Sequence, residues 1–506
     1  MRVLFVRPKS GFYVNQGSSP PLSSLALASF IQSKGHTVRV FDCQLERGLM
    51  KSVEEFAPDA VAVTLSSESV IPEALRVSRA LKALGLPVFW GGHMASAIPE
   101  EIARSGYVDY VGISEGEYTL LELLEVTAGR RAPETVLGIA YVDENGLYHR
   151  TGDRPFADLA DFPPLDYSLI PIKKYLNRFP FANRTFLMIS SKGCIFRCTF
   201  CYNNEYHRCQ RRVYPLEVLL QQIKTLAVDY GVNGVLFWDE LFGVDKQELR
   251  AFCQGVKGLG LGLVWTAVTA VGILSREDIM MMHEAGCRML CYGLESGSAE
   301  MRKKLHKYYD ASKIDETVRN CRDAGILFMP NFMIGLPDET PEQLRETVRL
   351  YFRTHPDMIT MSYYTPIPGS QLYRALEASG RMPPRKKTLE GIRLQTMEFQ
   401  HLAQNFSDVP AKDLQVIMQF VYWQTVFGKK QKTPGFDWGS NLKMLIINLL
   451  HYLRCAGLRG LARGVWEAGK LFCNVAWYAH AYPSIRKKYD LYAKNFGRTD
   501  WDETGH

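Results

Sequence analysis

The sequence predicts an α/β protein in which an N-terminal doubly wound, Rossmann-like parallel sheet is followed by a partial (β/α)6 barrel of the TIM type and a C-terminal helical domain. Three observations support this fold class. Short apolar runs alternate with helical patterns in the first 130 residues, a second alternating series begins near Phe186, and the periodicity after about Lys386 is wholly helical. Continuous apolar runs are typical of strands buried on both faces of a parallel sheet.

A chain of 506 residues is long enough for roughly two to four hydrophobic cores. We therefore expect a first domain over residues 1–130, a linker over 131–180, a barrel over 181–385 and a helical domain over 386–506. The linker is indicated by short strands such as GIAYVD and by the proline-bearing run DFPPLDYSLIP.

The first domain has strand-like runs at VLFV, TVRVFD, AVAVTL, PVFWGG and YVDYVGI, and an apolar helix from Leu22 to Ser33. Open parallel sheets bind ligands beyond the carboxyl ends of their strands. The segments expected there are rich in small or polar residues: Pro8 to Pro21, Ser66 to Ser69, Gly91 to His93 and Glu115 to Glu117.

The barrel strands are expected in FLMISS, VNGVLFWD, LVWTAV, MLCYGLES, LFMPNFMIG and MITMSYYTP, with a helix from Pro215 to Tyr230. The active site of such a barrel lies at the C-terminal strand ends. Cys194, Cys198 and Cys201 follow the first of these strands, in the run CIFRCTFC. The sequence therefore places three thiols at the expected active-site end.

Three closely spaced thiolates leave one iron of a cubane cluster open, as three protein ligands leave a catalytic zinc open. Lys192, Gly193 and Arg197 add flexibility and positive charge beside the thiols. The alternative is a zinc knuckle with His207 or Cys209 as fourth ligand, but no clear second ligand pair follows. The 11 cysteines, scattered through a long chain, do not suit a disulfide framework, so we expect reduced thiols.

The run CIFRCTFC resembles the CxxxCxφC signature of the radical S-adenosylmethionine (SAM) superfamily, with Phe200 as the aromatic residue. Four further runs look like strand-end motifs of its cobalamin-dependent branch (class B): GVNGVLFWDELF, CYGLESGS, FMIGLPDETPEQ and YYTPIPGSQLY. WGGHMASAIPEE and YVGISEGEYTLLELL resemble the cobalamin-binding domain of that branch. The resemblance covers roughly residues 1–380.

The resemblance implies a 4Fe–4S cluster, held by the three cysteines, whose open iron binds the amino and carboxylate groups of S-adenosylmethionine. An electron from the reduced cluster then breaks the C5′–S bond and releases a 5′-deoxyadenosyl radical. The implied S-adenosylmethionine contacts are Phe200, Tyr202, Glu240, Glu295, Ser296, Asn331, Ile334 and Gly335. No catalytic residue beyond the cluster ligands is implied. Structural roles stay open: Glu240 as a capping or solvated carboxylate, and Gly335 with Pro337 as a tight turn.

Cobalamin is the second cofactor that the resemblance implies, with contacts from Pro8, Ser66, Ser67, Gly91, Gly92, His93, Glu115 and Gly116. The sequence lacks a DxHxxG run, so no histidine replaces the lower cobalt ligand, as is usual in this branch. A cofactor-free domain of the same fold is the alternative. The third barrel strand ends in TAVTAV, where relatives commonly carry an arginine-bearing segment, which leaves carboxylate recognition there unassigned.

The function implied by the resemblance is methyl transfer from methylcobalamin to an unactivated carbon, or phosphorus, of a small-molecule or lipid-like biosynthetic intermediate. Alternatives are an oxidative cyclase or rearrangement enzyme with the same cofactors, and a non-catalytic cobalamin or iron–sulfur sensor. A methylthiotransferase is disfavoured because residues 1–126 contain only Cys43, where three further cluster cysteines would be needed. The implied electron donor is a low-potential protein such as flavodoxin or ferredoxin.

The net charge of +7 is concentrated in residues 428–506, where 13 Lys and Arg face 6 Asp and Glu. The run MLIINLLHYL, with Ser440 as expected N-cap region, and the basic and aromatic runs after it predict either an ordinary packed helical domain or helices resting at a membrane surface. No apolar run there is long enough to span a bilayer. The N-terminal run MRVLFVRP has no signal-peptide pattern, so we expect a cytoplasmic protein, with peripheral membrane contact as an option. Nucleic-acid binding has no motif behind it.

Overall fold

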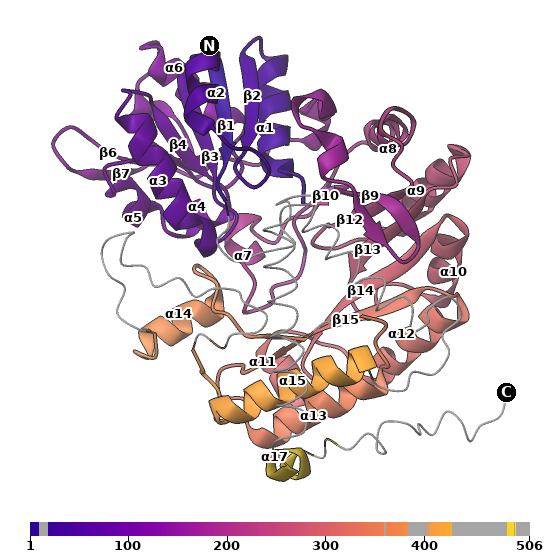
Figure 1. Cartoon of the computed structure of the whole chain (residues 1–506). Coiled ribbons are helices and arrows are strands. Elements are labelled where there is room, and N and C mark those ends of the chain that lie inside the picture. The colour runs from indigo at the N-terminus through magenta and orange to yellow at the C-terminus, as the bar shows by residue number, and fades with distance from the viewer. Residues whose placement is uncertain are drawn as a thin grey trace. The chain divides into compact units, whose positions relative to one another are not determined.

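The computed structural model describes residues 1–9, 19–358, 361–382, 402, 404–427, 483–489 and 491. The chain divides into two compact units (Figure 1). Unit 1 comprises Met1–Leu176, Lys192–Thr225 and Pro366–Thr396, and unit 2 comprises Asn177–Ser191, Leu226–Thr365 and Met397–His506. The segment Lys192–Thr225, which carries the three clustered cysteines, thus belongs to the same unit as the N-terminal sheet. The predicted boundaries near residues 130, 180 and 385 stay a prediction.

Unit 1 is built on a seven-stranded sheet with the order β2-β1-β3-β4-β5-β6-β7. Its parallel part consists of β1 (Arg2–Arg7), β2 (Thr37–Asp42), β3 (Ala60–Thr64), β4 (Val88–Gly91) and β5 (Tyr110–Gly112). The first strand is almost entirely buried, in agreement with its continuous apolar run. This confirms the predicted doubly wound parallel sheet.

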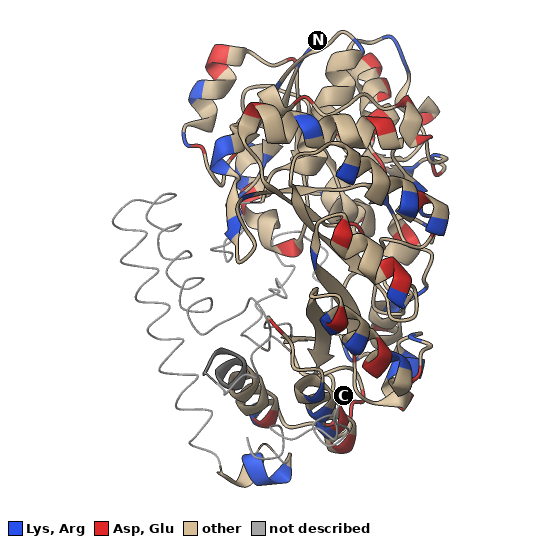
Figure 2. Cartoon of the chain, turned by 90° about the vertical axis from the view of Figure 1, so that its right-hand side faces the viewer, with Lys and Arg blue, Asp and Glu red and all other residues tan. Residues whose placement is uncertain are grey.

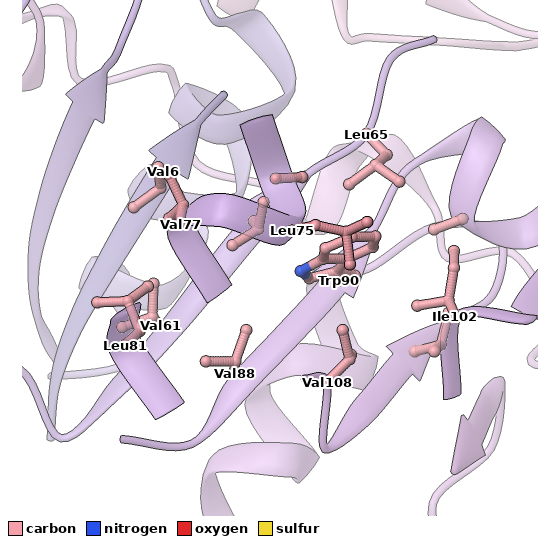
Figure 3. Packing of buried hydrophobic residues seen from close by; sticks show 14 of the residues in the cluster. Val6, Val61, Leu65, Leu75, Val77, Leu81, Val88, Trp90, Ile102 and Val108 are labelled. Carbon is pink, nitrogen blue, oxygen red and sulfur yellow. The ribbon is translucent and has the colours of Figure 1, made fainter. Parts of the chain in front are cut away.

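Helices cover both faces of this sheet. They are α1 (Leu22–Ser33), α2 (Leu49–Phe56), α3 (Ile71–Lys82), α4 (His93–Ala97), α5 (Pro99–Ala103) and α6 (Glu117–Thr127), with short 3-10 turns at Glu68–Val70, Pro133–Thr135, Leu159–Asp161, Tyr167–Leu169 and Ile172–Lys174. One core cluster joins Leu4 and Val6 of β1 to α2, α3, α4 and α5, and Trp90 lies within it, donating from its indole nitrogen to Ser78 Oγ at 2.8 Å (Figure 3). The alternate residues of β1, Val3 and Phe5, are equally buried but lie outside that cluster, as expected for a strand covered on both faces.

The last two strands of the sheet come from the predicted linker. β6 (Ile139–Val142) pairs antiparallel with β5, and β7 (Tyr148–Arg150) pairs antiparallel with β6. The sheet is therefore mixed at this edge, where the sequence predicted short linker strands only. A β-hairpin closed by the turn at Gly146 continues the sheet without a crossover helix.

Unit 2 contains the second sheet, with the order β16-β15-β14-β13-β12-β9-β8. Its six parallel strands are β9 (Ala182–Met188), β12 (Gly234–Phe237), β13 (Val264–Thr269), β14 (Cys287–Glu295), β15 (Leu327–Ile334) and β16 (Met361–Tyr363). They match the six predicted barrel strands and confirm a partial barrel. The antiparallel strand β8 (Asn177–Phe179) at the edge was not predicted, because three residues with two polar side chains carry no strand signal.

The helices of unit 2 and the remaining short elements complete the described structure. They are α9 (Lys246–Gly258), α10 (Arg276–Glu284), α11 (Ala299–Lys304), α12 (Ala311–Asp323), α13 (Pro341–Arg353), α15 (Ala411–Phe427) and α17 (Pro483–Lys488), with α8 (Leu216–Tyr230) shared between the units. Unit 1 also holds β10 (Ser191–Lys192, in part), α7 (Asn203–Tyr206), β11 (Arg212–Val213) and α14 (Gln371–Ala378).

Acidic and basic residues are interspersed along the helices of both units (Figure 2). Within the described part of the chain, no helix combines the length and apolarity that crossing a bilayer requires. The predicted N-cap region at Ser440, the run MLIINLLHYL and most of the basic C-terminal segment lie outside the described residues. The same is true of most of the loop from Pro8 to Pro21.

Candidate functional site

The three clustered cysteines lie on a loop whose base is a two-stranded ribbon of β10 and β11. Gly193 opens this loop with φ +84°, and a Cβ at this position would lie 2.0 Å from the carbonyl oxygen of Gln210. Only glycine permits this backbone conformation together with so close an approach. Gly193 is thus required for the ribbon to close beneath the cysteines.

Asn203 organises the loop from within and was not predicted as a functional residue. Its side chain is 1% exposed. Its Oδ1 accepts from the Cys194 N–H at 3.0 Å, and its Nδ2 donates to the Cys194 carbonyl oxygen at 2.8 Å. Since one buried amide satisfies both backbone groups of a cluster cysteine, Asn203 fixes the course of the chain through the loop.

Two backbone N–H groups are directed at cysteine sulfurs. Phe196 donates to Cys194 Sγ and Asn203 donates to Cys201 Sγ, each at 3.5 Å. Cys198 is 8% exposed, and its carbonyl oxygen accepts from Asn204 Nδ2 at 3.0 Å. Hydrogen bonds to sulfur are among the features that set the potential of iron–sulfur clusters, so the donor set fits thiolates that hold one.

The two residues that could supply a fourth ligand to a zinc knuckle lie beside other polar groups. Cys209 Sγ donates to Asn204 Oδ1 at 3.3 Å, and His207 Nδ1 lies 3.6 Å from Glu115 Oε1. Among the residues that the structure describes, no group of three or more His, Cys, Asp and Glu side chains is placed to hold a single metal ion. Thiolates of a cubane bind different iron atoms and do not converge on one point. The described cysteines form no disulfide.

The residues predicted to contact cobalamin share one edge of the N-terminal sheet. Pro8 follows β1, Ser66 and Ser67 follow β3, Gly91 ends β4, and Glu115 and Gly116 form the turn from β5 to α6. Gly92 has φ +107°, and a Cβ there would lie 2.5 Å from the carbonyl oxygen of Leu65. The small side chains at this edge leave backbone accessible to a ligand, and they fit a flat cofactor bound beyond the carboxyl ends of the strands.

Two of these residues contact the cysteine loop. The His93 ring stacks on Tyr202, the residue after Cys201, with 4.9 Å between ring centroids and 29° between planes. Glu115 forms a two-fold hydrogen bond with the Arg212 guanidinium, one of whose distances is 3.1 Å. Burial raises the pKa of Glu115, but Lys192 and Arg212 outweigh it and hold the pKa below its ordinary value. The Glu115 carboxylate is therefore ionised and engaged, while its predicted contact with cobalamin stays a prediction.

Asp239 is a buried carboxylate at the carboxyl end of the barrel strands in unit 2, and the sequence did not predict it as a site residue. It follows β12, is 2% exposed, and accepts from the Ser190 N–H at 2.6 Å and the Ser191 N–H at 3.2 Å. Burial raises the pKa of Asp239 and the hydrogen bonds lower it. The effect of burial is the larger, so the pKa rises to about 6. Asp239 thus ties the end of β12 to the end of β9, while the predicted Glu240 beside it is half-buried.

Glu295 ends β14 in a strained conformation with φ +63°, next to a register shift in the pairing of β14 with β15. Its carboxylate is buried, and Lys307 Nζ lies 3.3 Å from Glu295 Oε1. Burial raises the pKa of Glu295, and Lys307 offsets part of that rise. Strained, buried and charge-balanced carboxylates gather at functional sites. Lys307, 12 residues further along the chain, was not predicted.

Ser296 is wholly buried, and its hydroxyl is occupied by the protein itself. Its Oγ lies 3.0 Å from Thr347 Oγ1 of α13 and accepts from the Ser298 N–H at 3.1 Å. These contacts give Ser296 a structural task in anchoring the turn after β14, and its predicted contact with S-adenosylmethionine stays a prediction.

Asn331 and Ile334, two of the implied S-adenosylmethionine contacts, have side chains on opposite faces of β15. Along this strand Phe328, Phe332 and Ile334 are buried, while Asn331 is half-buried on the alternate face. Successive side chains of a strand alternate between faces, so residues three apart point in opposite directions. The side chains of Asn331 and Ile334 therefore leave β15 on opposite faces, and the contact of each residue with S-adenosylmethionine stays a prediction.

Gly335 follows β15 with φ +74°, and its N–H donates to Glu339 Oε2 at 2.7 Å. Glu339 is fully buried. Burial raises its pKa and the hydrogen bonds from Gly335 and Leu336 lower it, and because the effect of burial is the larger the pKa rises to about 8. The glycine in this turn is required by the backbone conformation, and the carboxyl group holds the turn in place.

Two family models match the chain. The B12 binding domain matches residues 14–124, and the Radical SAM superfamily matches residues 188–351. The first covers β2 to β5 of the N-terminal sheet, with the small residues that follow β3, β4 and β5, and the second begins at the end of β9 and covers the cysteine loop and β12 to β15. Both matches agree with the cofactors that the site residues fit.

Similar proteins include one named as a methyltransferase and one named as a cyclase. An uncharacterized methyltransferase of Pyrococcus horikoshii is 28% identical over 74% of this chain and 82% of its own length. An anaerobic magnesium-protoporphyrin IX monomethyl ester cyclase of Cereibacter sphaeroides is 27% identical over 74% of this chain and 64% of its own length. The relatives of this chain are thus named both as a methyltransferase and as a cyclase.

Among solved structures, the cobalamin-dependent S-adenosylmethionine radical enzyme OxsB, with aqua-cobalamin and S-adenosylmethionine bound, superposes with a TM-score of 0.68. The match covers 99% of this chain and 80% of that chain at 15% sequence identity. At this identity the likeness shows the fold, a mixed sheet followed by a partial barrel.

Proposed function

Because the chain is an enzyme of the radical SAM superfamily with a B12-binding domain ahead of its radical domain, we propose that it is a cobalamin-dependent methyltransferase. The proposed acceptor is an unactivated carbon, or phosphorus, of a small-molecule or lipid-like intermediate. The observation that carries the proposal is the relative named a methyltransferase, which aligns over 82% of its own length.

The residues of the chain have distinct proposed tasks. Cys194, Cys198 and Cys201 hold the cluster, and the sheet edge from Pro8 to Gly116 holds cobalamin. When bound, the cluster supplies the electron that cleaves S-adenosylmethionine, and cobalamin supplies a carrier for a methyl group. A low-potential donor such as flavodoxin or ferredoxin reduces the cluster.

Glu295 and Lys307 form the proposed contact for the polar end of S-adenosylmethionine. An ionised Glu295 accepts from an ammonium group, and Lys307, 3.3 Å away, offers a cation to a carboxylate. Without ligand, Glu295 and Lys307 form an ion pair with each other. A zwitterionic ligand can replace this pair by two, one between its ammonium group and Glu295 and one between its carboxylate and Lys307. Asp239 and Glu339 hold the adjoining turns in shape.

The test is an anaerobic assay of the full chain, reconstituted with iron and sulfide, with and without cobalamin, and reduced. We expect 5′-deoxyadenosine together with S-adenosylhomocysteine, the second dependent on cobalamin, both followed by mass spectrometry. Cys198→Ala serves as the control without cluster chemistry, and Cys253→Ala, a buried cysteine on α9, as the control for a substitution elsewhere. Production of 5′-deoxyadenosine by the Cys198→Ala variant would contradict the cluster assignment.

The second candidate is an oxidative cyclase or rearrangement enzyme with the same cofactors. The similarity to the cyclase of Cereibacter sphaeroides favours it. This candidate predicts 5′-deoxyadenosine without S-adenosylhomocysteine and a product whose mass gains no methyl group. A non-catalytic sensor predicts neither compound from a protein that contains its cluster.

A further inference from the structure

The cysteine loop is closed at its base by two cations that both reach into the turn between β5 and α6. Lys192 precedes the loop on β10, and its Nζ lies 2.6 Å from Glu117 Oε1 and 3.9 Å from Glu115 Oε1. Arg212 follows the loop on β11, and its guanidinium donates to both carboxylate oxygens of Glu115. The two glutamates belong to the segment that matches the B12 binding domain, and the two cations to the segment that matches the radical SAM superfamily.

These four side chains are largely shielded from water. Their exposed fractions are 13% for Lys192, 7% for Glu117, 10% for Glu115 and 17% for Arg212. Arg212 also lies over the Phe156 ring at 4.3 Å and donates to the Ala157 carbonyl oxygen at 2.9 Å. Separating these ions would leave buried charges without partners, which is far more costly than separating an exposed pair. The base of the loop therefore cannot move away from the turn without losing both ion pairs together.

A second set of contacts holds the loop beside its last cysteine. His93, at the start of α4, stacks on Tyr202. Ser114 Oγ donates to the Tyr206 carbonyl oxygen at 3.0 Å. The cysteine loop is thus attached at its base and beside Cys201 to residues at the edge of the N-terminal sheet where ligands are expected.

We propose that Glu115, Glu117, Lys192 and Arg212 are positioning residues that hold the iron–sulfur loop on the B12-binding domain and thereby fix the separation between cluster and cobalamin. This rests on the proposed function only in requiring that both cofactors bind. Electron and group transfer between two cofactors requires a defined separation. The ionic contacts can fix this separation because the loop and the B12-binding edge both belong to unit 1.

The test uses the full chain loaded with the cluster and with cobalamin in its paramagnetic Co(II) state. A nearby reduced cluster accelerates the spin relaxation of the cobalt, which is read from the microwave power that saturates its EPR signal. We expect Arg212→Gln and Glu117→Gln to lose most of this acceleration, while Arg212→Lys retains it because the charge remains. Lys82→Met is the matched control: it removes the Lys82–Asp109 pair, 2.7 Å long, in the same domain but away from the loop, and should relax as the parent protein does.

A second measurement covers variants that bind too little cobalamin for EPR. The same two variants should lose iron to an added chelator about tenfold faster than the parent chain, in the range known for residues that support a metal site. Parent-like relaxation and parent-like chelation in both Arg212→Gln and Glu117→Gln would overturn the proposal. If the parent chain binds no cobalamin, the proposed function fails, and the chelation rates still test whether the ion pairs hold the loop.

Discussion

At the scale of single residues, buried polar side chains with one or two backbone partners set the geometry around the cysteines. Asn203 and Asp239 are the main examples. Both lie beside residues that the motifs single out, Asn203 two positions after Cys201 and Asp239 one position before Glu240. The sequence does not reveal which residue beside a motif is buried, because burial depends on strands and loops far away in the chain.

We predict that Asn203→Ala weakens the cysteine loop and lowers cluster content. The substitution leaves the backbone N–H and carbonyl of Cys194 without their partner, a loss of about 1–3 kcal/mol for buried groups. The measurement is the iron and sulfide bound per chain after reconstitution, together with the cluster absorbance. Asn145→Ala, in the exposed turn between β6 and β7, is the control and should bind as the parent does. Full cluster content in Asn203→Ala would show that the loop does not depend on this amide.

A second residue-scale prediction concerns pH. Burial raises the pKa of Asp239 from its ordinary value of 3.8 to about 6. The folded chain holds this proton more tightly than the unfolded chain, so the stability that it contributes is complete below about pH 4 and is lost as pH rises through 6. Two pKa units correspond to roughly 3 kcal/mol.

The comparison is between the parent protein and Asp239→Asn, which cannot titrate. The free energy of unfolding of the parent relative to the variant should fall by up to about 3 kcal/mol between pH 4 and pH 7, followed by urea denaturation. Asp229→Asn, which removes an exposed carboxylate from α8, should leave the pH profile of the parent unchanged. Parallel profiles for the parent and Asp239→Asn would contradict the burial argument.

Residue partners across long sequence distances were the least predictable feature. Glu115 was predicted as a cobalamin contact from the family resemblance, and the structure adds Arg212, 97 positions away, as its partner. Lys307 beside Glu295 and Thr347 beside Ser296 are further cases. No local pattern encodes such pairs, since each depends on how separate elements are brought together.

At the scale of elements, long and strongly apolar strands were predictable to within a few residues. The helix Leu22–Ser33 and the strand Thr37–Asp42 have the predicted bounds, and all six barrel strands are present. The strand β6 was predicted as a short linker strand but not assigned to the sheet. The strands β7 and β8 are three residues long and rich in polar residues, so they give no clear alternation.

The N-terminus of α13 allows a prediction at this scale. Thr340 Oγ1 accepts from the Gln343 N–H at 3.3 Å, and Gln343 Oε1 accepts from the Thr340 N–H at 3.0 Å, which forms a capping box. Thr340→Ala should destabilise unit 2 by about 1 kcal/mol. Chemical denaturation measures the loss, and Thr340→Ser, which keeps the hydroxyl, should recover most of it. An alanine variant as stable as the parent would mean that tertiary packing alone sets the start of α13.

At the scale of the whole molecule, charge is unevenly distributed. Residues 428–506 carry 13 of the 60 Lys and Arg and only 6 of the 53 Asp and Glu, an excess that equals the net charge of +7. If this segment binds membrane, binding to vesicles that contain anionic lipid should fall steeply as salt rises, since screening removes the attraction. Cosedimentation measures it, with uncharged vesicles as one control and a chain ending at Gln431 as the other. Equal binding by the shortened chain would rule out a membrane role for the segment.

The assignment of Lys192–Thr225 to unit 1 has a consequence for building hybrid proteins from this family. A recombination point between residues 130 and 180 looks natural from the domain pattern, yet it would take Glu115 and Glu117 from one parent and Lys192 and Arg212 from the other. Unless both parents carry the same four charged residues, such a chimaera would contain buried charges without an ion-pair partner. Exchanges that keep these four residues from a single parent are the ones we expect to retain both cofactor sites.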